Sequence, residues 1–139
     1  MTAIIVLNSR SLQDVIMNCE TSEKTLKTKS FEVNFDYNIS EVKYWDGIFV
    51  VLLDIPVGTN EIDNVYGVDS SGKVVWRIEN AARAFSVDEN APWYNTYAQN
   101  IYVGINLSAD GILVAFSHQS MKYTVDCKTG KLLDETFTK

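Results

Sequence analysis

The chain has 139 residues, and its 18 acidic and 12 basic residues give a formal net charge of −6 at pH 7. That balance argues against a nucleic-acid-binding protein, because phosphate backbones are bound by clustered lysine and arginine, and it suits a basic protein partner better. The length and the 46% hydrophobic content are those of one domain, residues 1–139, with its own core, while 16 Phe, Trp and Tyr residues beside only two prolines favour β-sheet.

Location, metals and cofactors can be judged from a few absences in the sequence. No apolar run reaches the roughly 18 residues that span a bilayer, and the start of the chain lacks the basic segment and cleavage site of a signal peptide, so we expect a cytoplasmic protein away from membranes. Cys19 and Cys127 lie far apart and are expected to be separate thiols. No Cys-x-x-Cys spacing or phosphate-binding loop is present, so neither a metal nor a cofactor is expected.

The first 40 residues carry weak signals of regular structure. An apolar run at 3–7 predicts a short strand, and residues 11–20 predict a brief helix that Ser11 would cap. Residues 21–30 are polar and lysine-rich, which predicts a loop or an exposed edge. Residues 31–37 alternate large apolar with polar side chains, the period of a half-buried strand. We expect this N-terminal segment to close one side of the domain.

From residue 41 on, strand signals follow one another closely. The dipeptide Asp46-Gly47 joins two apolar runs as a tight hairpin, and the second run is apolar on both faces, as a central strand would be. Further along, a Ser-Ser-Gly turn at 70–72 joins another strand pair. Residues 80–100 show no clean period and predict a long loop with one helical turn near Ala81. Strands resume at residue 101 and continue to 137.

Two parts of this region are built on one plan, approximately 41–79 and 101–137. Each contains an Asp-Gly hairpin, an apolar run, a Tyr-x-Val-Asp strand end and a Gly-Lys turn. Such an internal repeat predicts two meanders of four strands each. The predicted fold is therefore all-β and mostly antiparallel, with two propeller-like meanders packed as a sandwich or a partly open barrel.

The turn sequences carry a family resemblance. "VYGVDSSGKVVW" resembles the strand-turn-strand signature of quinoprotein-type β-propeller repeats, and "YTVDCKTGKLL" matches it except at Asp134, where the signature has a tryptophan. In that family the motif is structural and does not hold the quinone. The resemblance therefore implies turn and packing roles for Asp69, Gly72, Trp76, Asp126 and Gly130. A whole propeller needs about four blades or more, so two meanders do not make a quinoprotein enzyme.

The arrangement also resembles a class of small bacterial all-β proteins. These carry a "GKVVW" hairpin in the middle and a "YTVD…TGKLL" hairpin near the C-terminus, as this chain does. Some of them are immunity proteins that neutralise a toxin domain. The resemblance implies a non-catalytic protein whose partner is another protein.

The charge distribution agrees with a basic partner. No lysine or arginine occurs from 44 to 72 or from 84 to 121, and the second stretch contains the acidic, aromatic sequence "DENAPWYNTY". Acids beside large aromatics in a loop are typical of a contact surface for a basic protein, and a nuclease toxin must be basic to hold nucleic acid. The predicted partner-binding residues are Asp63, Asp88, Glu89, Trp93, Tyr94 and Tyr97. As alternatives, Trp93 and Tyr97 could cap the core, or the aromatics could form a carbohydrate platform.

Two other function classes stay open at this point. One is a propeller-derived scaffold that oligomerises through open sheet edges. The other is a small hydrolase using His118 with nearby carboxylates, for instance a triad of Ser117, His118 and Asp110. Adjacent residues of a strand point to opposite faces, which places Ser117 and His118 poorly as partners. We therefore expect no enzyme.

Overall fold

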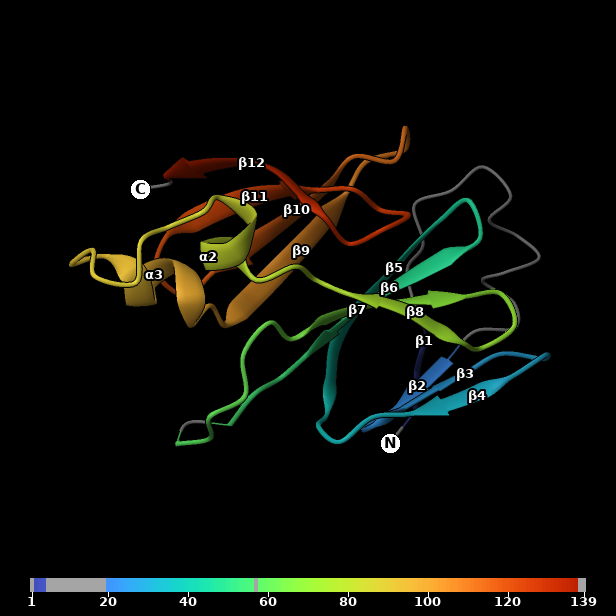
Figure 1. The fold of residues 1–139 in the computed structure, drawn as a ribbon. Helices are drawn as coiled ribbons and strands as arrows, with labels where there is room; N and C mark the ends of the chain where they lie inside the picture. The colour runs from blue at the N-terminus through green and yellow to red at the C-terminus, as the bar shows by residue number, and fades with distance from the viewer. Residues whose placement is uncertain (1, 5–19, 57, 138–139) are drawn as a thin grey trace.

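A computed structural model describes residues 2–4, 20–56 and 58–137 of the chain (Figure 1). In that part, twelve strands form three four-stranded antiparallel sheets, each with its strands side by side in chain order. The first sheet contains β1 (Thr2–Ile4), β2 (Glu20–Ser22), β3 (Thr25–Lys27) and β4 (Glu32–Asn34). The middle sheet contains β5 (Ile39–Trp45), β6 (Ile48–Leu53), β7 (Val65–Asp69) and β8 (Val74–Arg77). The third sheet contains β9 (Tyr102–Leu107), β10 (Leu113–Ser117), β11 (Met121–Val125) and β12 (Leu132–Phe137).

The middle and third sheets are the two predicted meanders. They occupy residues 39–77 and 102–137, close to the predicted repeat bounds, and the prediction of a mostly antiparallel all-β fold is confirmed. Asp46 and Gly47 adopt positive φ values of 45° and 87° between β5 and β6, as a tight hairpin requires. Every residue of β6 is buried, which matches its apolar sequence and its place inside the middle sheet.

The first sheet is a third meander that the sequence did not predict. Residues 21–30 were expected to be a loop or an exposed edge, and that prediction is wrong: β2 and β3 occupy inner positions of the sheet. Leu26, fully buried between two polar neighbours, supplies the apolar contact that fixes β3. The predicted half-buried strand at 31–37 is confirmed only over residues 32–34, as β4. The predicted helix at 11–20 lies outside the described residues, except that Glu20 begins β2.

Two hydrophobic clusters hold the three sheets together in a stack, with the middle sheet between the other two (Figure 1). The opposite faces of β6 divide between the clusters: Val50 and Leu52 pack toward the third sheet, whereas Phe49 and Val51 pack toward the first. Such alternation follows from the two-residue period of a strand. The middle sheet is therefore covered on both faces, and the molecule is an open series of stacked meanders.

Aromatic side chains pack onto turn glycines of the next sheet along the chain. A Cβ atom on Gly130 would lie 2.6 Å from Trp76, and one on Gly72 would lie 2.6 Å from Phe31. Trp76 also donates its Nε1 hydrogen to the carbonyl oxygen of Cys127 at 2.9 Å. Both glycines have positive φ, 75° and 88°. At these two positions glycine is needed both for the turn and for the space that an aromatic ring fills.

The connection between the middle and third sheets projects beyond the stack (Figure 1). It contains α2 (Ala81–Ala84), the predicted helical turn, and α3 (Tyr94–Ala98), which the sequence did not predict. Asn80 caps α2, because its side-chain oxygen accepts a hydrogen bond from the backbone N–H of Ala82 at 3.1 Å. This connection carries most of the predicted partner-binding residues.

Candidate functional site

The predicted contact residues divide into exposed and buried groups. Asp88 and Glu89 are exposed, and Trp93 leaves 58% of its surface open to solvent at the start of α3. Tyr94 is half-buried in the same segment. Asp88 shapes its own loop, because its Oδ1 accepts a hydrogen bond from the backbone N–H of Asn90 at 2.9 Å. The structure thus brings four of the six predicted residues together at the projecting end of the molecule.

Tyr97 and Asp63 lie deeper than predicted. Tyr97 packs against the cluster between the middle and third sheets, and its hydroxyl contacts Oε1 of Glu135 at 3.2 Å. Burial first, and then the nearby Glu135 carboxylate, raises the pKa of Tyr97 above its usual value. Asp63 is only 7% exposed. Of the two alternatives for the aromatics, Tyr97 thus follows the core-capping one, and Asp63 faces the interior.

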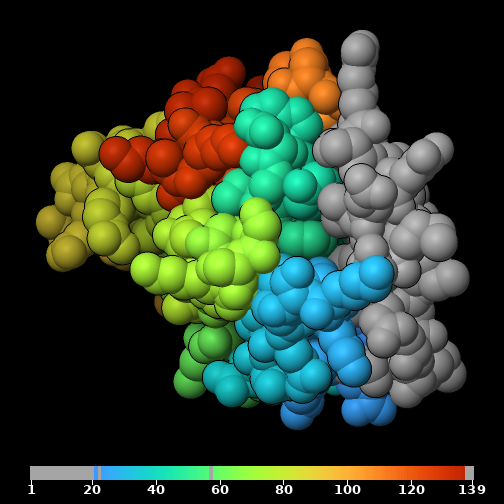
Figure 2. Space-filling view, turned by 90° about the vertical axis from the view of Figure 1, so that its right-hand side faces the viewer, coloured from blue at the N-terminus to red at the C-terminus, as the bar shows by residue number. Residues whose placement is uncertain are grey.

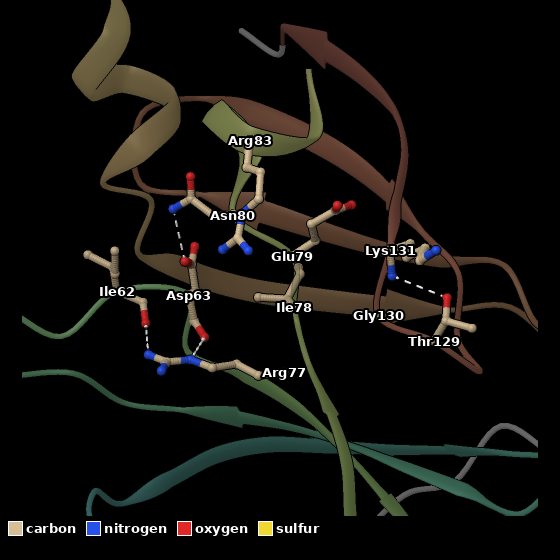
Figure 3. Close-up of a pocket in the computed structure, with 10 residues that line it drawn as sticks. All are labelled: Ile62, Asp63, Arg77, Ile78, Glu79, Asn80, Arg83, Thr129, Gly130 and Lys131. Carbon is tan, nitrogen blue, oxygen red and sulfur yellow. Dashed lines mark hydrogen bonds between the residues drawn. The ribbon is translucent and has the colours of Figure 1, made fainter. Parts of the chain in front are cut away.

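The carboxyl group of Asp63 opens into a polar groove beside the junction of the middle and third sheets (Figure 3). The groove has a volume of about 430 Å³ and is lined by the loop before β7, the stretch from β8 into α2, and the turn between β11 and β12. Stacking of the two sheets places that turn beside Asp63, although the two are far apart in sequence. Its basic residues, Arg77, Arg83 and Lys131, stand out in a chain of net negative charge.

Hydrogen bonds fix part of this groove. Asn80 donates its side-chain N–H groups to Oδ2 of Asp63 at 3.0 Å and to the carbonyl oxygen of Ala98 at 2.9 Å. Arg77 donates to the carbonyl oxygens of Ile62 and Asp63 at 2.5 and 3.1 Å. Desolvation raises the pKa of Asp63, and the hydrogen bond from Asn80 opposes that shift. Backbone carbonyl oxygens therefore hold the guanidinium of Arg77. One oxygen of the Asp63 carboxyl, Oδ1, accepts no hydrogen bond from the described residues.

A second hollow lies on the other side of Arg83. It has a volume of about 570 Å³, and its lining includes Asn80, Arg83, Glu89 and Tyr94. Two of the predicted contact residues, Glu89 and Tyr94, therefore face a concave part of the surface. A long side chain of a partner could enter there.

The catalytic triad considered from the sequence does not assemble. His118 is exposed and its Nδ1 lies 3.2 Å from the carbonyl oxygen of Ile101. Ser117 is buried, and its hydroxyl oxygen accepts backbone hydrogen bonds from Gln119 and Met121. Asp110 lies beyond the opposite end of β10, roughly 16 Å away along a five-residue strand, and is hydrogen-bonded to Ser108.

The thiol of Cys127 and the carboxylate of Asp69 also contribute to the fold. Burial raises the pKa of Cys127 to about 11, so this thiol stays protonated at neutral pH and is a weak nucleophile. Among the described residues, no group of three or more His, Cys, Asp or Glu side chains is placed to hold a metal ion. Asp69 shapes its turn by accepting hydrogen bonds from Ser71 and Lys73, and the bond from the Ser71 hydroxyl lowers its pKa. No helix in the described part of the chain is long and apolar enough to cross a membrane.

Comparison with known proteins shows the family. A family model described as a domain of unknown function, DUF7957, matches residues 16–137. The chain belongs to the DUF7957 family. A search of curated proteins found no match to this DUF7957 chain.

Solved structures similar to the DUF7957 chain support a β-propeller-like fold. One is the β-propeller domain of Cps50 (Swd1) from Myceliophteria thermophila, with a TM-score of 0.64 and 13% identity over 98% of the chain. Another is the computationally designed Ika8 protein, with a TM-score of 0.53 and 13% identity over 88% of the chain. The chain spans 41% and 34% of the length of these two proteins. At this identity the likeness concerns the fold alone, and the four antiparallel strands of each sheet are the number found in a propeller blade.

Sequence reasoning missed the groove and the basic residues that line it. Asn80 could have been found, because an asparagine before Ala-Ala-Arg is a good helix cap. Arg83 and Lys131 carried no local signal, since they meet only when α2 and the turn between β11 and β12 are brought together by sheet stacking. The predicted contact surface was based on the stretches without lysine or arginine, and Arg83 and Lys131 lie outside those stretches.

Proposed function

We propose that this protein is a non-catalytic, cytoplasmic protein-binding domain, an immunity protein that neutralises a basic toxin domain by direct contact. The observation that carries the proposal is the exposed Trp93 on a projecting segment that also presents Asp88 and Glu89 (Figure 1). A tryptophan left 58% exposed, at the end of the molecule farthest from the first sheet, is available to a partner. Large aromatics of this kind dominate the binding energy of many interfaces.

Charge supports a basic partner. No lysine or arginine lies between residues 84 and 121, so Arg83 is the one basic residue of the α2–α3 segment that contains Asp88 and Glu89. An acidic rim around an aromatic anchor speeds encounter with a cationic surface, while burial of the anchor slows dissociation. The hollow lined by Glu89 and Tyr94 adds a carboxylate and an aromatic face at the part of the lining away from Arg83 in the sequence, and these two groups suit an arginine or lysine side chain.

The fold suits a presenting role. The stacked sheets bury both faces of the middle sheet, and Asn80 and Tyr97 anchor the projecting segment to them. A rigid support reduces the entropy lost when a loop binds its partner. The separation of Asp110 from His118 and the internal hydrogen bonds of Ser117 also favour a non-catalytic role.

The test first looks beside this gene for one encoding a large secreted protein with a C-terminal toxin domain, which the proposal predicts, and then uses that toxin domain. We expect the purified chain to bind that domain and to protect cells that express it. The double charge reversal Asp88→Lys/Glu89→Lys should weaken binding about tenfold or more, and Trp93→Ala should weaken it by about the same factor. Surface plasmon resonance at several salt concentrations measures both effects.

A matched control separates local contact from net charge. Glu32→Lys/Asp36→Lys makes the same change in net charge at two exposed positions of the first sheet and its flank. This control should keep the affinity within about twofold at physiological salt, because charges farther away than a Debye length are largely screened. Full retention of binding and protection by both the Asp88/Glu89 and the Trp93 variants would overturn the proposal.

A further inference from the structure

The groove beside Asp63 contains a buried acceptor without a partner. Oδ1 of Asp63 is buried and accepts no hydrogen bond from the residues that the structure describes, whereas Oδ2 accepts one from Asn80. The residue as a whole is 7% exposed and lines the groove. Because an unsatisfied buried carboxylate oxygen costs free energy, a hydrogen-bond donor is missing at this point.

Two further cations line the same groove, and the charge of one of them, Arg83, acts on the carboxyl group of Asp63. Arg83 and Lys131 are exposed, and neither side chain makes a hydrogen bond or ion pair with the described residues. Figure 3 shows the guanidinium of Arg83 directed toward Asp63, with Lys131 at the opposite end of the groove. Arg77 differs from both, since carbonyl oxygens and Glu61 already engage its guanidinium.

The other residues that line the groove restrict the kinds of ligand that it can bind. Asp63 and Glu79 carry negative charge, which opposes a multiply charged anion such as a nucleotide. Ile62 is half-buried and adds apolar surface next to these polar groups, whereas Ile78 is only 3% exposed and belongs to the core. A volume of about 430 Å³ is too large for a single ion or water and lies within the range of small-molecule sites.

We propose that this groove binds a small zwitterion, an aliphatic α-amino acid, with its ammonium group at Asp63 and its carboxylate at Arg83, toward which the exposed side chain of Lys131 extends from the opposite end of the groove. The ammonium supplies the missing donor, and the two cations neutralise the carboxylate through charge-assisted hydrogen bonds. The exposed side chain of Arg83 turns from Asp63 toward the ligand carboxylate, which opens the path to Oδ1. The aliphatic side chain packs against the exposed part of Ile62.

The experiment is a titration of the full chain with L-leucine, followed by ¹H–¹⁵N NMR. We expect saturable shifts of the backbone amides of residues 62–63, 77–83 and 129–131, on three separate segments that line one groove. N-acetyl-L-leucine, which lacks the ammonium, and L-leucinamide, which lacks the carboxylate, should bind about tenfold more weakly or worse. Equal binding of either derivative would overturn the proposal, as would shifts produced by inorganic phosphate but not by leucine.

Substitutions in the groove test which side chains bind the charged groups of leucine. Lys131→Gln and Arg83→Gln should each weaken leucine binding about tenfold, and Asp63→Asn should do the same. Lys73→Gln, an exposed lysine in the turn between β7 and β8, is the matched control and should leave the affinity unchanged. Lys131 and Arg83 are exposed, so their variants keep the fold even if Asp63→Asn does not. Unchanged affinity in both of these exposed variants would contradict the assignment, whatever the outcome for the toxin partner.

Discussion

At the scale of single residues, Gly130 and Trp76 form the contact that joins the middle sheet to the third. Gly130 combines a φ of 75° with a space that the indole ring fills, and the indole N–H satisfies the carbonyl oxygen of Cys127. Neither residue can change alone, because a side chain at 130 would meet the ring and a smaller residue at 76 would leave a void. The family signature in the sequence is thus explained by packing between sheets.

Replacing Gly130 with alanine should destabilise the protein by about 2–4 kcal/mol, since backbone strain and overpacking add. Gly58→Ala is the matched control: Gly58 has a φ of 94°, but no atom of the described residues lies within 4 Å of the added methyl group. The control should cost only about 1 kcal/mol. Urea unfolding measures both values, and equal costs in the two variants would show that the contact with Trp76 contributes nothing.

Asp63 should make stability depend on pH. Burial raises its folded-state pKa above the ordinary value of 3.8, so native Asp63 keeps a proton where the unfolded chain has lost it. Its contribution to stability is therefore fully present below pH 3.8 and is lost as the pH rises through the folded pKa. We expect the free energy of unfolding of the wild type to fall, relative to Asp63→Asn, across this window. Parallel pH curves for the two proteins would contradict this expectation.

At the scale of elements, the α2–α3 segment depends on one capping residue. Asn80 caps α2, contacts the carboxyl of Asp63 and holds the carbonyl oxygen of Ala98 at the end of α3. Both helices are short, and α3 has no capping side chain of its own, so neither would be stable alone. The surface proposed to bind a partner is therefore positioned by a residue at its base.

Asn80→Ala should remove the cap and two further hydrogen bonds, at a cost of about 2–3 kcal/mol. We expect amide hydrogen exchange in α2 and α3 to become about tenfold faster or more, while β10 is affected only through global stability. Asn106→Ala, at an exposed position of β9, should change stability by less than about 0.5 kcal/mol. Unaltered exchange in α3 would show that Tyr97 alone anchors the segment.

The strands also show how much of the fold can be predicted from the sequence. Strand period and turn dipeptides were enough to predict β5 to β12 and the repeat, because apolar runs and Asp-Gly turns are local signals. The first sheet was missed because its strands have only three residues each and β3 has a single apolar residue, Leu26. Exposure of Trp93 and burial of Asp63 depend on how the loops fold back onto the sheets, which no local pattern encodes.

At the scale of the whole molecule, the third sheet ends the stack with an altered outer face. By strand register, Ile112, Val114 and Phe116 occupy the places that Ile48, Val50 and Leu52 hold on the middle sheet. The two tryptophans that dock the middle sheet onto the third, Trp45 and Trp76, are replaced by Ser108 and Asp134. The outer face of the third sheet therefore keeps an apolar strip but lacks the two tryptophans that dock one sheet onto the next.

Restoring both tryptophans with Ser108→Trp/Asp134→Trp should promote self-association through this face, because it creates a contiguous exposed apolar patch. Light scattering over a concentration series should show a rise in molar mass that the wild type does not show at the same concentrations. Ser30→Trp/Asp36→Trp adds the same aromatic area at exposed positions around the first sheet. Equal association in this control would mean that surface tryptophans act without regard to the face.

The long connection within the first sheet has a consequence for folding. Ile4 pairs with Glu20, so closing the β1–β2 hairpin spans 15 intervening residues, whereas β10 and β11 are separated by only three. The longer closure costs on the order of 1–2 kcal/mol more in chain entropy, and three-residue strands return little of it. The middle and third meanders can therefore form from local hairpins, and β1 joins last. In the folded state we expect β1, a three-residue edge strand, to be among the first parts of the sheet structure to exchange its amide hydrogens.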